Sequence, residues 1–79
     1  MNETLEKVIE ILTELHEDVD FRTRERLWDD HILDSFDVVT LTSELNNEFD
    51  IVITADRLTP ENFNSAQALA AMVEELEDI

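Results

Sequence analysis

Ser35 is the residue of this 79-residue chain whose surroundings best fit a chemical role. It lies between Asp34 and Asp37, where a polar stretch gives way to a helical apolar pattern. The first N–H groups of a helix have no partner within the helix, and their partial positive charge favours anions. The Ser35 hydroxyl is therefore placed to be the attachment point of a phosphate-containing group. The alternative is that Ser35 only caps the helix, because Ser and Asp are both preferred N-cap residues.

The elements that must position Ser35 are predicted to be helices. Apolar residues recur at intervals of three and four, which predicts an all-α chain, a small four-helix bundle with three long helices, one short helix and a long first loop. Long helices are predicted over residues 3–17, 35–49 and 65–77, and helical turns near residues 56–58 and at Pro60. Glutamates form a stripe opposite the apolar face of the first helix, and we expect that face to be solvated.

The long first loop, residues 18–34, is expected to be held to the core by Phe21, Leu27 and Trp28. The run 51–53 looks like a strand, but so helical a chain offers it no partner strand. We therefore predict that this run is an extended connector that fills part of the core.

Two faces of the second helix are predicted to have different roles. The core face consists of Val38, Leu41, Leu45 and Phe49. Phe36 and Val39 fall on another face, beside Ser35, and partly exposed apolar residues there would suit a docking surface. The alternative is that the adjacent loop covers them.

Composition limits the kinds of partner. Twenty-one acidic residues against five basic ones give a formal charge of −16, so nucleic acid and anionic membrane surfaces would repel the chain. Basic patches on other proteins are the expected partners, unless the charge serves only solubility. There is no cysteine, no apolar run of ~20 residues and no basic leader. We expect one domain, residues 1–79, monomeric and cytoplasmic, without membrane insertion.

The sequence resembles the carrier-protein family, whose members bear a 4′-phosphopantetheine arm on a serine. The triplet Asp34-Ser35-Phe36 resembles the family's Asp-Ser-Leu attachment motif. The likeness extends over nearly the whole chain, through residues 28–36, Leu41 with Leu45, 49–51 and 63–65. It implies the carrier-protein helical bundle, and a protein that is not itself an enzyme.

The resemblance also implies a chemistry and a set of partners. A separate transferase with Mg²⁺ would remove the Ser35 proton, and the oxygen would attack the β-phosphate of coenzyme A. The thiol of the attached arm would then hold an acyl or aminoacyl group as a thioester, loaded by an adenylating ligase or an acyltransferase with a basic docking patch. The carrier itself would bind no metal. The expected contacts with partners or cargo are Asp34, Phe36, Asp37, Val39 and Ile53. The alternative for Ile53 is that it belongs to the core.

Departures from the family pattern point to a subtype. The chain has no glycine, and His31 stands where family members commonly have one; His tolerates the left-handed region better than most residues. Thr40, Asn46 and Asn47 stand where fatty-acid carriers usually have acids. These features resemble freestanding carriers of the D-alanyl type more than fatty-acid carriers, which stay an alternative.

Two other kinds of function have to be compared with the carrier. A Ser-His-Asp hydrolase would need His16 or His31 close to Ser35, and a pocket that a small bundle can scarcely form. Both histidines are expected to be ordinary surface or loop residues. The remaining rival is an acidic helical binding module that never receives the arm.

Overall fold

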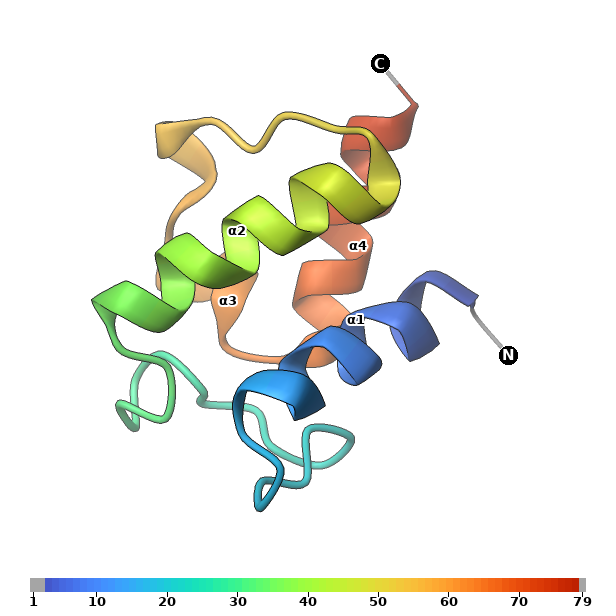
Figure 1. Cartoon of the computed structure of the whole chain (residues 1–79). Coiled ribbons are helices and arrows are strands. Elements are labelled where there is room, and N and C mark those ends of the chain that lie inside the picture. Colours follow the sequence, from blue (N-terminus) through green and yellow to red (C-terminus); the bar gives the residue numbers. More distant parts are fainter. Residues whose placement is uncertain (1–2, 79) are drawn as a thin grey trace.

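The computed structural model describes residues 3–78, and within that range the chain is helical, without a β-strand (Figure 1). The elements are α1 (Glu3–Leu15), α2 (Ser35–Phe49), the 3₁₀ turn η1 (Ala55–Arg57), α3 (Pro60–Phe63) and α4 (Ala66–Glu77). The predicted all-α bundle of three long helices and one short one is therefore confirmed. Residues 1, 2 and 79 of the predicted domain lie outside the described residues.

α1 ends at Leu15, two residues before the predicted end. Its last turn contains no basic residue, and Glu14 lies there instead. An acid at this end is unfavourable because the helix dipole already places negative charge there. The helix therefore ends earlier than the apolar pattern alone predicts.

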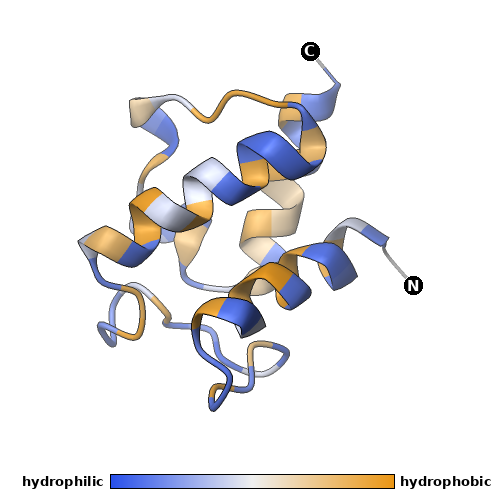
Figure 2. Ribbon diagram, viewed as in Figure 1, coloured by the Kyte–Doolittle hydropathy of each residue, from blue (hydrophilic) through white to orange (hydrophobic). Residues whose placement is uncertain are grey.

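The core lies where α4 packs against both α1 and α2. Figure 2 shows apolar colour on the inward faces of these helices, and the most deeply buried large side chains are Phe21, Phe63, Leu12, Leu27, Leu41, Leu45, Leu69, Val8 and Val73. On the core face of α2, Phe49 is only partly buried, at the end of the helix. A single cluster of this kind is the expected core of a domain this small.

The long first loop is fastened to the core by apolar side chains, as predicted. Phe21 and Leu27 are fully buried, and Trp28 is partly buried with its ring packed edge-on against Phe63, at a centroid distance of 5.8 Å. Arg22 adds a polar tie, since its guanidinium donates to both carboxylate oxygens of Glu6 at 2.6 and 2.7 Å. These hydrogen bonds lower the pKa of the Glu6 carboxyl from its usual value.

Asn64, at the end of α3, is the main polar link between the loop and the rest of the bundle. Its side-chain oxygen accepts from the N–H groups of Trp28 and Asp29 at 3.0 and 3.1 Å, and its side-chain nitrogen donates to the Asp29 carboxylate at 3.1 Å. Its backbone carbonyl accepts from the Leu27 N–H at 2.9 Å. One residue thus fixes the part of the loop that lies just before Ser35.

We expect Asn64→Ala to destabilise the fold by about 1–2 kcal/mol, because two backbone N–H groups lose their acceptor. Thermal unfolding followed by circular dichroism should show a melting temperature lower by ~4–8 °C for each kcal/mol lost. Asn47→Ala, at an exposed position of α2, is the matched control and should leave the melting temperature nearly unchanged. Equal melting temperatures for both variants would show that the Asn64 contacts contribute nothing.

The connector after α2 is extended, as predicted. Asp50 ends α2 in the left-handed conformation, with φ 53°. Asn46 then fixes the connector, because its side-chain oxygen accepts from the Ile53 N–H at 3.0 Å and its carbonyl from the Ile51 N–H at 3.2 Å. Ile51 and Ile53 are buried, whereas Val52 between them is 72 % exposed. The alternation is that of any extended segment, in which successive side chains point to opposite sides.

Candidate functional site

Ser35 is the first residue of α2, and its side chain is exposed. The residue that caps the helix is Asp34, whose carboxylate accepts the Asp37 N–H at 2.8 Å, while the Asp37 carboxylate accepts the Asp34 N–H at 3.3 Å. This reciprocal pair is a capping box, which holds the first turn of a helix. The alternative that Ser35 itself is the cap is therefore wrong. Among the described residues, its hydroxyl has no hydrogen-bond partner and is free for chemistry.

The environment of Ser35 fits an attached phosphodiester. The N–H groups of Ser35 and Phe36 are the first two of the helix, so no carbonyl within α2 can accept from them. Free N–H groups and the positive end of the helix dipole stabilise an anion there, by about 0.3–1 kcal/mol at an exposed site. A phosphate bonded to the Ser35 oxygen would thus meet donors that the fold leaves available.

A groove of about 520 Å³ adjoins Ser35 and gives an attached arm room to lie. It is formed by the first loop, the start of α2 and the segment after η1, and its lining residues are Trp28, His31, Leu33, Asp34, Ser35, Val38, Val39 and Leu58. Most of these side chains are apolar. A long, uncharged chain that starts at the Ser35 oxygen therefore fits the residues present.

Phe36 and Val39 are exposed beside Ser35, at 71 % and 66 %, so the alternative that the loop covers them is wrong. Figure 2 shows apolar colour at the beginning of α2, at the edge of the molecule.

Ile53 was expected to face the cargo, but it is 7 % exposed and belongs to the core, because the connector turns it inward. Val52 is the exposed apolar residue of the connector, an exposure that the sequence did not predict. Only the alternation of the segment could have indicated it.

The two acids of the motif are engaged within the chain rather than pointing freely outward. Asp34 and Asp37 form the capping box, and the Asp37 carboxylate also contacts the His16 ring, Nε2 to Oδ2, at 2.7 Å. Sequence reasoning took His16 for an ordinary surface residue and missed this contact, because the two residues lie far apart in the chain. His16 follows the last residue of α1, so the contact joins α1 to the first turn of α2.

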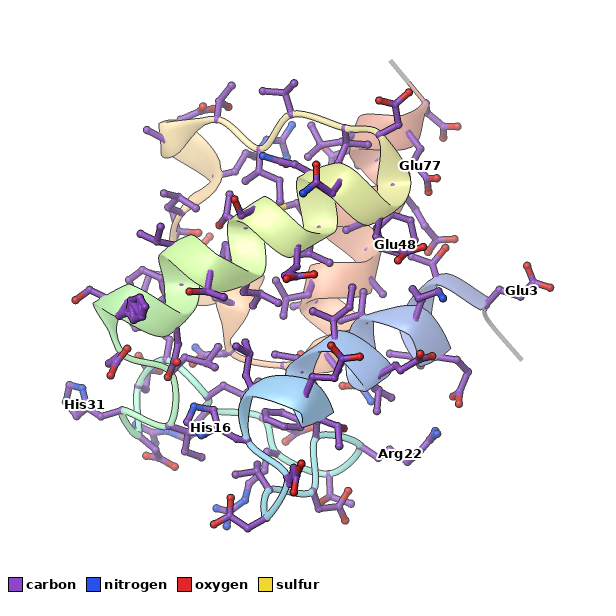
Figure 3. All side chains as sticks on the ribbon, in the orientation of Figure 1. Glu3, His16, Arg22, His31, Glu48 and Glu77 are labelled. Atoms are coloured by element: carbon purple, nitrogen blue, oxygen red, sulfur yellow. The ribbon has the colours of Figure 1, made fainter. Side chains whose placement is uncertain are left out.

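His31 adopts the left-handed conformation, with φ 59°, at the place where a glycine was expected. Backbone hydrogen bonds close the turn, from the His31 N–H to the Trp28 carbonyl at 3.1 Å and from the Leu33 N–H to the Leu27 carbonyl at 3.0 Å. The turn before Ser35 thus forms without glycine, and the His31 side chain extends outward from the loop (Figure 3).

Neither histidine makes a catalytic arrangement with Ser35. Within residues 3–78, no hydrogen bond joins Ser35 to His16 or His31, so the geometry of a Ser-His-Asp site is missing from the part of the chain that is described. The described side chains also contain no group of three potential metal ligands. No helix in this range has the length and apolar character needed to cross a membrane.

Comparison with known proteins agrees with this geometry. Residues 3–73 match the family model described as "Phosphopantetheine attachment site". The D-alanyl carrier proteins of Streptococcus sanguinis and Streptococcus gordonii are each 39 % identical over 71 residues, which cover 89 % of this chain and 90 % of theirs. The D-alanyl carrier protein of Lactococcus lactis is 33 % identical over 81 residues, covering 99 % of this chain and 98 % of its own. The chain therefore belongs to the carrier-protein family, whose members bear a phosphopantetheine attachment site.

Proposed function

We propose that this chain is a freestanding carrier domain, residues 1–79, that holds an aminoacyl group, D-alanyl in the first place, as a thioester on a 4′-phosphopantetheine arm bonded to Ser35. The observation that carries the proposal is an exposed serine hydroxyl at the first position of α2, released from capping by Asp34 and open to a groove. Relatives called D-alanyl carrier proteins, of nearly the same length, support the cargo.

The attachment step uses the Ser35 oxygen as the nucleophile. This oxygen forms a bond to the β-phosphorus of coenzyme A, the P–O bond to the α-phosphate breaks, adenosine 3′,5′-bisphosphate leaves, and the serine proton passes to a base of the transferase. Mg²⁺ is bound by the transferase, where it neutralises the phosphates. Once bound, the arm supplies a thiol that exchanges acyl groups. The carrier residues orient the hydroxyl and bind the phosphate, and they carry out no catalysis of their own.

The partners are a phosphopantetheinyl transferase and an adenylating ligase, each with a basic patch that complements the charge of −16. Phe36 and Val39 would form the apolar centre of the docking surface, with Asp34 and Asp37 on its rim. Such a ligase consumes ATP, and the arm comes from coenzyme A, so we place the function in the cytoplasm. The carrier is proposed to act as a monomer.

Incubation of the purified chain with coenzyme A, Mg²⁺ and a broad-range phosphopantetheinyl transferase tests the proposal. Electrospray mass spectrometry should show that all of the purified protein gains the mass of one arm. A binding module that never receives the arm would keep its mass under conditions that modify a known carrier in the same tube. That result would overturn the proposal in favour of the acidic binding module.

Phe36→Ala should lower kcat/KM for modification or for ligase loading about tenfold, because exposed aromatic anchors contribute much of the energy of an interface. The melting temperature should hardly change, since the side chain is 71 % exposed. Val52→Ala removes a similarly exposed apolar side chain from the connector and serves as the control. Normal loading together with a clear loss of stability would show that Phe36 is part of the core instead.

A further inference from the structure

A side-chain hydrogen bond between His16 and Asp37 joins the end of α1 to the first turn of α2, which bears Ser35. The His16 Nε2 lies 2.7 Å from the Asp37 Oδ2. Figure 3 labels His16 just beyond the end of α1, near the beginning of α2. The side chains are 32 % and 18 % exposed, so both are partly shielded from water. A charge-assisted hydrogen bond of this length is among the stronger polar contacts in proteins.

The oxygen that His16 contacts, Asp37 Oδ2, is also part of the capping box at the start of α2. The same Asp37 Oδ2 accepts the Asp34 N–H at 3.3 Å, a long hydrogen bond on its own. This long hydrogen bond alone fixes the Asp37 carboxylate only weakly. The His16 ring contacts the same oxygen and therefore helps to set the orientation of the carboxylate. Ser35 and Phe36 are the two residues enclosed by the capping box, so their backbone is fixed as firmly as the box is.

His16 also suits this position electrostatically. Two carboxylates, those of Asp34 and Asp37, share the capping box, and the last turn of α1 contains no basic residue. A ring N–H directed at Asp37 offsets part of this negative charge. The Nε2–H donor is present in imidazolium and in the corresponding neutral tautomer, so the contact needs only that this nitrogen carries hydrogen.

We propose that His16 is a positioning residue of the attachment site, which holds the first turn of α2 through Asp37 and thereby fixes the Ser35 oxygen for modification. The modification part of this inference rests on the proposed function, whereas the effect on the helix start does not. Three chains compared with wild type separate the two: His16→Leu removes the donor, His16→Gln keeps a side-chain N–H donor, and Glu17→Gln changes a neighbouring exposed charge.

The first readout is hydrogen exchange of the Asp37 and Val38 amides, whose acceptors are the Asp34 side chain and carbonyl. His16→Leu should speed their exchange about fivefold, the factor expected for one lost hydrogen bond, while the amides of α4 stay unchanged. His16→Gln should restore most of the protection, and Glu17→Gln should match wild type. In a chain that carries Asp37→Asn, the further change His16→Leu should have a much smaller effect.

The second readout is the rate of arm attachment by the transferase. His16→Leu should lower kcat more than KM, since the oxygen is less well oriented while the docking surface is intact, and His16→Gln should recover the rate. Unchanged exchange in His16→Leu, or faster exchange spread evenly over α4 without rescue by Gln, would overturn the positioning role. A wild-type chain that is never modified would overturn the proposed function instead, and the exchange pattern would still decide the role of His16.

Discussion

Ser35→Ala is expected to abolish attachment of the arm completely, because no other hydroxyl of the described chain lies at a helix start beside the groove with free N–H groups. After incubation with coenzyme A and the transferase, the variant should keep its original mass while wild type gains one arm. The fold should be unaffected. Ser35 is not the cap, so its replacement by alanine removes no capping hydrogen bond.

Asp34→Ala is the informative comparison for this result. It removes the cap and should destabilise the chain by about 1 kcal/mol, yet it leaves the nucleophile in place. Circular dichroism and thermal melting of both variants separate loss of the nucleophile from loss of the helix start. Arm attachment that persists in Ser35→Ala would show that another residue accepts the arm.

The second large effect concerns the cargo. When the modified chain is offered in parallel to a D-alanine-activating ligase and to a malonyl transferase of fatty-acid synthesis, we expect efficient aminoacylation and little malonyl loading. The reason lies on α2, where Thr40, Asn46 and Asn47 stand in place of acids and leave Asp37, Glu44 and Glu48 as the acids of the helix. Complementary charge governs such encounters, so a partner that needs a continuous acidic face should dock poorly. Intact-mass spectra report both reactions directly.

An acidic variant of α2 makes this prediction sharper. Asn47→Asp adds charge at an exposed position, whereas Asn46 accepts the hydrogen bond that fixes the connector and is better left intact. Asn47→Asp should improve loading by the malonyl transferase without changing the fold. Efficient malonyl loading of the unaltered chain with no aminoacylation would reverse the assignment and favour the fatty-acid carrier.

The helical periodicity was enough to predict the bundle, the start of α2 at Ser35 and the extent of α4, which the structure begins at Ala66 and ends at Glu77 as against the predicted 65–77. Such features follow from residues close together in the chain. The same reasoning could not choose between Asp34 and Ser35 as the cap of α2, because both residue types cap well and only the backbone angles decide.

What the sequence could not predict depends on contacts between distant segments. His16 and Asp37 are 21 residues apart, and the loop that joins the helices sets whether they meet. The direction of Ile53 was likewise undetermined, since residues 51–53 are all apolar and either side of an extended segment could face the core. The Asn46 hydrogen bonds fix the connector, and Ile53 lies inside while Val52 lies outside.

The position of the arm on the modified wild-type chain tests the account most directly. Trypsin cleaves after Arg26 and Arg57, which releases residues 27–57 as one peptide that contains Ser35 together with several other hydroxyl residues. Fragmentation of this peptide in the mass spectrometer assigns the added mass to a single residue. We predict that it is found on Ser35 alone. Added mass on any other hydroxyl of the peptide, or on another part of the chain, would contradict the account.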